Sequence, residues 1–185
     1  RRIEETPRLK YYIRLGLILG FAGLAKYTSI LLLPPFLVYW ILRRRYDLIL
    51  SKKMFAAAAV AFLLITPVLY WNLQNDWVSF RYQGGHVFGS SSAKLEPFFI
   101  SLAAQAGAYS PFLFVIALYG FIRSFRSPND WVRLSLLVGG TIWAFFLYTS
   151  FYEVPLPHWV SPFYLLFIPL GTYFLSVDAG KAKRY

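Results

Sequence analysis

The stretch RLKYYIRLGLILGFAGLAKYTSILLLPPFLVYWILRRR, residues 8–45, decides the fold class of this chain. It contains two apolar runs, residues 9–25 and 28–42, with Lys26 and Tyr27 between them and basic residues at both outer ends. Each run has ~15–17 residues, or about 25 Å of helix, slightly less than the ~30 Å hydrocarbon core of a bilayer. The stretch therefore predicts a helical hairpin in a membrane whose two ends lie on the same side. Lys26 is then expected near the opposite interface or in a recess below it.

The basic residues follow the same pattern along the whole chain. Nearly all of the 19 Lys and Arg residues cluster at those ends of the apolar runs that fall on one predicted side of the membrane. The exceptions are Lys26, Arg81 and Lys94. Cytoplasmic loops of membrane proteins collect Lys and Arg. The clustered ends are therefore predicted to be cytoplasmic and the three exceptions to face the other side. The clusters are Arg1, Arg2, Arg8, Lys10 and Arg14; Arg43, Arg44, Arg45, Lys52 and Lys53; Arg123, Arg126 and Arg133; and Lys181, Lys183 and Arg184.

Composition agrees with a membrane protein. The chain is 58% hydrophobic and 15% charged, whereas a soluble domain usually carries about 25% charged residues. The net charge of +11 is spread over loops where it meets anionic lipid headgroups, so no nucleic-acid partner is expected. The absence of cysteine excludes disulfides, thiolate catalysis and Cys-bound metals within this sequence. Because the only Met is Met54, we expect the sequence to be a piece of a longer protein.

Four further apolar segments follow, at residues 54–72, 98–125, 131–152 and 158–177, the second of them interrupted by Gly107 and Pro111. Gly16 and Gly20 form a GxxxG step that lets a neighbouring helix approach closely. The pattern predicts an all-α, polytopic membrane protein with about six membrane helices, in a single domain over residues 1–185.

Residues 73–97 are too polar to span a membrane and are predicted to form an outer-face loop. Within it, residues 76–82 can form a short interfacial helix with aromatic side chains at headgroup depth. The sequence Gly84-Gly85-His86 is expected to end that helix.

Two groups of residues could bind an anion on the outer face. Lys26 is a charge between apolar helices, with Tyr27 as an adjacent hydroxyl donor, and it either awaits an anion such as a phosphate or snorkels to the headgroups. Arg81 can hold a phosphate with two parallel hydrogen bonds, and His86 follows two glycines. The alternative for this pair is a surface helix whose Arg81 touches lipid phosphates.

A third group is Glu153, His158 and Trp159, around the outer turn Val154-Pro155-Leu156-Pro157. A carboxylate and an imidazole could shuttle a proton or bind a metal, but the usual zinc spacings are missing and no metal site is predicted. The alternative is an exposed loop acid with His158 capping the last helix and Trp159 anchoring it at the interface. No complete catalytic set appears, and none of the outer-face acids stands in an obvious catalytic context.

Several motifs occur in an order that resembles a known family. They are GFAGLAKYTSILLLPP (residues 20–35), PVLYWN (67–72), DWVSFRYQ (76–83) followed by Gly85-His86, and Pro157-His158-Trp159 through Pro162-Phe163-Tyr164. Together they resemble the bacterial family 39 glycosyltransferases, the protein-mannosyltransferase-like group related to lipid A aminoarabinose transferases. Relatives often carry Pro-Asn-Trp where this chain has Pro157-His158-Trp159.

The resemblance implies a GT-C membrane fold of a dozen or so helices, of which this chain is the middle-to-C-terminal part. It implies a polyprenyl-phosphate sugar donor used on the periplasmic face of a bacterial inner membrane. The acceptor is expected to be a glycan, a lipid or a protein, and the cofactor stays open, with a divalent metal possible but not required. Lys26, Tyr27, Arg81 and His86 would lie near the donor phosphate.

The resemblance also implies a catalytic carboxylate upstream of Arg1, so this chain alone is expected to be inactive. The sequence thus predicts the membrane-embedded portion of a glycosyltransferase. The rival interpretations are a transporter or flippase module, in which Lys26 would be a substrate or proton site, and a purely structural membrane subunit.

Overall fold

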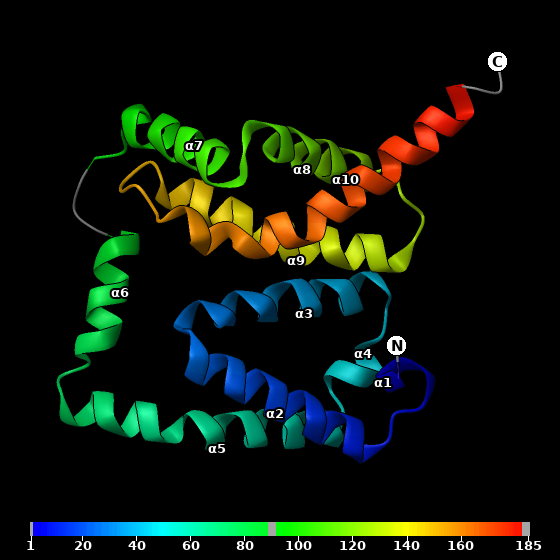
Figure 1. The fold of residues 1–185 in the computed structure, drawn as a ribbon. Coiled ribbons are helices and arrows are strands. Elements are labelled where there is room, and N and C mark those ends of the chain that lie inside the picture. The colour runs from blue at the N-terminus through cyan, green and yellow to red at the C-terminus, as the bar shows by residue number, and fades with distance from the viewer. Residues whose placement is uncertain (1, 89–91, 183–185) are drawn as a thin grey trace. The chain divides into compact units, whose positions relative to one another are not determined.

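The computed structural model describes residues 2–88 and 92–182. The described residues form helices and connecting turns and contain no strand, so the predicted all-α class is confirmed. The chain forms two compact units, Arg1–Gln83 and Gly84–Tyr185. They are called the first and second unit below, and each is described by itself (Figure 1).

The first unit contains the predicted hairpin. Helix α2 runs antiparallel to the arm formed by the 3-10 helix η1 and α3 (Figure 1). The arm begins as a 3-10 helix and becomes α-helical where Pro34 and Pro35 occupy the first turn of α3, a position that needs no N–H donor. The elements are α1 (Arg2–Glu5), α2 (Leu9–Ala25), η1 (Tyr27–Leu32), α3 (Leu33–Leu42), α4 (Tyr46–Ile49), α5 (Lys52–Gln74) and α6 (Val78–Phe88), which continues into the second unit.

Glycines let α2 pack closely against α5. A Cβ on Gly16 would collide with the backbone oxygen of Ala57, and one on Gly20 would lie 2.6 Å from Leu64 Cδ1. The close helix approach expected from the GxxxG step is therefore confirmed, with α5 as the partner. Because later glycines of α2 meet later residues of α5, the two helices run parallel. The basic residues at their starts consequently share one end of the unit.

The second unit packs α8 against α10 through glycines. A Cβ on Gly120 would lie 2.6 Å from the Gly171 nitrogen, and one on Gly171 would collide with the Ile116 oxygen. At one end of this pair, Arg123 Nη2 lies 2.8 Å from Asp178 Oδ1, and the Tyr119 hydroxyl donates to the same carboxylate. The elements are α7 (Leu95–Tyr109), α8 (Pro111–Ser124), α9 (Asp130–Thr149), the 3-10 helix η2 (Pro157–Val160) and α10 (Ser161–Ala182).

The segment expected to form one interrupted helix over residues 98–125 is two helices. Helices α7 and α8 meet at an angle of 107°. Ser110 joins them with φ 66° and ψ 137°. The residue before a proline avoids the α-helical region, so Pro111 forces the chain out of the helix at Ser110. The interruption was predicted, but its angle was not.

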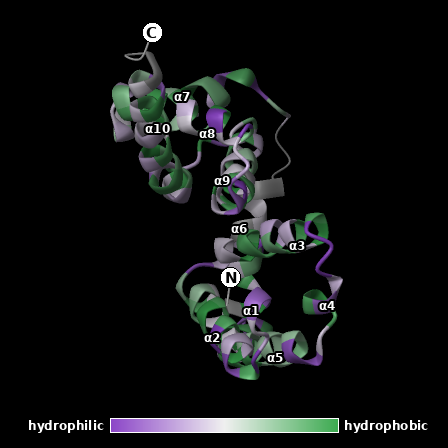
Figure 2. Cartoon of the chain, turned by 90° about the vertical axis from the view of Figure 1, so that its right-hand side faces the viewer, coloured by the Kyte–Doolittle hydropathy of each residue, from purple (hydrophilic) through white to green (hydrophobic). Residues whose placement is uncertain are grey.

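Three helices are long and apolar enough to cross a membrane, and the bent α7–α8 pair would be a fourth. They are Lys52–Gln74, Asp130–Thr149 and Pro157–Gly180, while Tyr27–Leu42 is a shorter apolar helix. Large apolar side chains remain uncovered in both units: Leu63 is 68% exposed in the first and Phe112 82% in the second. Figure 2 shows hydrophobic residues over the helices of each unit and a hydrophilic segment leading from α3 to α4. Such surfaces fit a lipid environment.

Candidate functional site

Lys26 stands at a break in the first hairpin. Helix α2 ends at Ala25, and Lys26 is extended, with φ −160° and ψ 128°. Its N–H still donates to the Ala22 carbonyl, and its own carbonyl accepts from the Ser29 N–H at 3.0 Å. Arg8 and Lys10 lie at the start of α2, and Lys26 follows its last residue. Lys26 therefore lies at the opposite end of this helix from those basic residues. Its side chain is exposed.

A buried asparagine holds the turn from α5 into α6. Asn72 is fully buried, and its side chain donates to the Val68 carbonyl at 3.0 Å and accepts from the Ser79 N–H at 3.2 Å. Its backbone carbonyl accepts from the Trp77 N–H at 2.7 Å. Asn72 thus caps the first turn of α6 from a distance. The turn itself contains two left-handed residues, Asp76 and Trp77, with φ 51° and 58°.

The first turn of α6, which Asn72 caps, contacts the residue that follows Lys26. The ring centroids of Tyr27 and Phe80 lie 5.2 Å apart, and those of Trp77 and Phe80 lie 5.7 Å apart. Arg81 follows Phe80, is exposed, and donates its backbone N–H to the Trp77 carbonyl. The structure therefore brings the segment with Lys26 and Tyr27 next to the helix turn with Arg81, which are two of the predicted outer-face candidates.

His86 lies on the same helix as Arg81, in the second unit, and its side chain falls outside the described part of the structure. The expectation that Gly84-Gly85-His86 ends this helix is wrong, because α6 continues to Phe88. Neither Gly84 nor Gly85 has positive φ, and a glycine in a helix only lowers its stability, by ~1 kcal/mol relative to alanine.

The third candidate group surrounds the turn after α9. Glu153 and His158 are exposed, and Trp159 packs against Phe146 with ring centroids 5.8 Å apart. The backbone N–H of Lys94 donates to the Phe151 carbonyl, which joins the start of α7 to this turn. Among the described residues, no group of three or more His, Asp or Glu side chains could hold a metal ion.

A buried polar network, which the sequence analysis missed, lies behind that turn. Gln105 is 1% exposed, and its Oε1 accepts from Trp143 Nε1 at 3.2 Å and from the Tyr164 hydroxyl at 3.0 Å. The Tyr164 ring stacks on Tyr109, with centroids 3.8 Å apart. A single glutamine in an apolar helix was the available signal, because a polar side chain in a membrane needs partners.

The network reaches the turn after α9 through hydroxyl groups. The Tyr109 and Ser161 hydroxyls lie 2.9 Å apart, and the Ser161 hydroxyl donates to the His158 carbonyl. Helices α7, α9 and α10 therefore fix the backbone at His158, while its imidazole stays exposed. The arrangement fixes the turn after α9, and among these residues no nucleophile is paired with a base.

Two comparisons with known proteins give a match. Residues 1–71 match the family described as dolichyl-phosphate-mannose-protein mannosyltransferase. The chain is similar to the lipid A galacturonosyltransferase RgtD of Rhizobium johnstonii, with 29% identity over 117 residues. That alignment covers 63% of this chain and 24% of the relative, so it spans about a quarter of the relative's length. No solved structure matches the chain significantly.

Proposed function

We infer the function from the premise that this chain is a GT-C family glycosyltransferase-like fragment of a membrane protein, which both matches support. We propose that the whole enzyme transfers a sugar from a polyprenyl-phosphate donor to a glycan, lipid or protein acceptor on the outer face of the membrane. Within this chain, Lys26, Tyr27, Arg81 and His86 are proposed to bind the donor phosphate.

The contact between Tyr27 and Phe80 carries this proposal, because it joins the segments that bear Lys26 and Arg81. Sugar transfer breaks the bond between the anomeric carbon and the donor phosphate oxygen, and the electron pair leaves with the phosphate. Two cations beside that oxygen stabilise the charge that develops on it. The proton of the acceptor hydroxyl goes to a carboxylate that we expect upstream of Arg1.

The donor class and the sidedness rest on two further arguments. The matched family's description contains a sugar linked to a lipid phosphate, whereas the similar protein's name contains lipid A. We therefore propose a lipid-phosphate sugar as the donor. The acceptor stays open among the three classes named above, a glycan, a lipid or a protein. If the basic ends lie in the cytoplasm, as is usual, Lys26 faces the periplasm of a bacterial inner membrane. Glu153, His158 and Trp159 are proposed as a separate outer-face site within the second unit.

The test uses the intact enzyme and a purified polyprenyl-phosphate sugar. Lys26→Ala and Arg81→Ala should each lower kcat/KM by about tenfold to a hundredfold, because each removes a charge-assisted hydrogen bond to the phosphate. Lys26→Arg should have a kcat/KM between that of Lys26→Ala and that of the parent enzyme, because it keeps the positive charge.

Lys94→Ala is the matched control, since it removes an exposed outer cation that is not proposed to touch the donor. It should keep the activity of the parent enzyme. Parent activity in both Lys26→Ala and Arg81→Ala, with normal membrane insertion, would discard the proposed phosphate site.

A further inference from the structure

Helix α3 ends in a hydrogen-bonding motif that normally contains glycine. The Arg44 N–H donates to the Ile41 carbonyl and the Arg45 N–H to the Trp40 carbonyl, both at 2.9 Å. These are the two bonds of a Schellman motif, whose left-handed position most often holds glycine. Here that position holds Arg44, with φ 54°. A side chain in this conformation is strained, and such strain often marks a functional residue.

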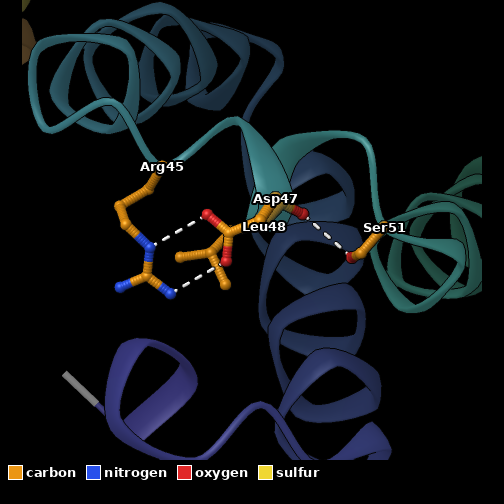
Figure 3. A network of polar contacts seen from close by, with 4 residues as sticks. All are labelled: Arg45, Asp47, Leu48 and Ser51. Atoms are coloured by element: carbon orange, nitrogen blue, oxygen red, sulfur yellow. Dashed lines mark hydrogen bonds and ion pairs between the residues drawn. The ribbon is translucent and has the colours of Figure 1, made fainter.

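The same turn contains a neutralised acid. Arg45 Nε and Nη2 each lie 3.0 Å from an oxygen of Asp47, a two-bond pair drawn in Figure 3. The hydrogen bonds from Arg45 lower the pKa of the Asp47 carboxyl. Among the described residues, neither Arg44 nor Lys52 makes an ion pair. The segment 43–52, which we name the basic elbow, therefore keeps a positive charge.

The basic elbow also exposes apolar side chains beside its cations. Leu42 is 71% exposed, Tyr46 52% and Leu50 73%, whereas Leu48 is 1% exposed and anchors the elbow in the unit. The Ser51 hydroxyl donates to the Leu48 carbonyl (Figure 3). The same hydroxyl accepts from the Met54 N–H and so caps α5. Exposed apolar groups next to cations on an anchored turn fit the boundary between headgroups and acyl chains.

We propose that the basic elbow binds the phosphate groups of anionic membrane phospholipids, with Arg44 as the main ligand. Arg44 presents a planar guanidinium that can bind a phosphate with two hydrogen bonds, and Lys52 adds a second positive charge. Leu42 and Leu50 enter the acyl-chain boundary beside it. This lipid contact is independent of the sugar-transfer proposal, because it uses none of the residues assigned to the donor.

The experiment measures how strongly spin-labelled phosphatidylglycerol, relative to spin-labelled phosphatidylcholine, associates with the intact protein in phosphatidylcholine vesicles. Arg44→Gly should reduce the preference for phosphatidylglycerol on the order of fivefold, because each cation at an anionic surface contributes about that factor. The same variant should melt at an equal or higher temperature, since glycine relieves the left-handed backbone. A residue with a purely structural role would not combine these two results.

Two further variants keep the outcome decisive. Arg44→Asn removes the charge with a residue that tolerates positive φ, and it should lose the same preference. Asp76→Gly relieves a left-handed residue outside the elbow and should keep the preference of the parent protein. An unchanged preference in Arg44→Gly or Arg44→Asn would overturn the proposal and leave the elbow a topological signal only.

Discussion

The two units hold their helices together in different ways. In the first, α2 and α5 touch along glycines and small side chains, and large apolar residues such as Ile18 and Leu63 stay exposed. In the second, the glycine contact between α8 and α10 is backed by stacked aromatic rings and the Gln105 network. Because the hydrophobic force between helices in lipid is weak, such helices associate through close approach of their backbones and through polar bonds. The second unit uses both devices, whereas the first depends mainly on close approach.

The largest expected effect is that of a bulky side chain in the first unit's glycine contact. Gly16→Val should push α2 away from Ala57 and destabilise the first unit by ~3 kcal/mol, at the upper end for overpacking. Gly171→Val should affect the second unit less, because its side-chain network remains. Hydrogen exchange measured by peptide should therefore rise more over residues 9–25 in the first variant than over residues 161–182 in the second.

Gly107→Val is the control for both substitutions, since an added Cβ at Gly107 meets nothing within 4 Å. It should leave exchange in both units unchanged. A greater rise over residues 161–182 in Gly171→Val than over residues 9–25 in Gly16→Val would reverse the comparison.

A smaller effect is expected from removing the centre of the polar network. Gln105→Leu leaves the Trp143 N–H and the Tyr164 hydroxyl without their acceptor, which should cost about 1 kcal/mol of unfolding free energy. The loss should be smaller when Gln105→Leu is introduced into a Tyr164→Phe background, because one of the two orphaned donors is gone. Unfolding in mixed micelles measures both values, and strict additivity would show that the network is not a unit.

The smallest effect is expected at the exposed Arg45–Asp47 pair of the first unit. Its hydrogen bonds hold the pKa of Asp47 below its usual value, so the pair stabilises the fold above the unfolded carboxyl pKa of ~3.9. That stabilisation is lost as the pH falls through the lower folded pKa. Asp47→Asn should therefore lower the Tm only slightly near neutral pH and not at all in strong acid. A difference that persists in acid would show that the side chain acts through packing.

Helix positions were predictable because they depend on local hydrophobic runs and charges. Residues 9–25 were expected as a helix and α2 spans Leu9–Ala25, while 54–72 was expected and α5 spans Lys52–Gln74. The break at Pro111 was predictable for the same local reason. The angle at Ser110 was not, since it depends on what α7 and α8 pack against.

Contacts between distant residues were less predictable. The glycines of α2 predicted a close partner, but not that it would be α5. The sequence placed Lys26 and Arg81 on one face by charge, whereas the contact that joins their segments needs the Asn72 turn, which no local pattern revealed. Asn72 and Gln105 are buried polar residues in apolar helices, and each has a partner outside its own helix: Ser79 for Asn72, and Trp143 and Tyr164 for Gln105.

The 3-10 helix after Lys26 also changes how far the second arm of the hairpin extends. A 3-10 helix rises ~2.0 Å per residue and an α-helix ~1.5 Å. The six residues of η1 therefore lengthen the arm by about 3 Å, and with the ten residues of α3 it extends ~27 Å. A segment of only sixteen residues thus comes close to the thickness of the hydrocarbon layer, so if this arm crosses the membrane, as its sequence predicts, the bilayer around it needs little thinning.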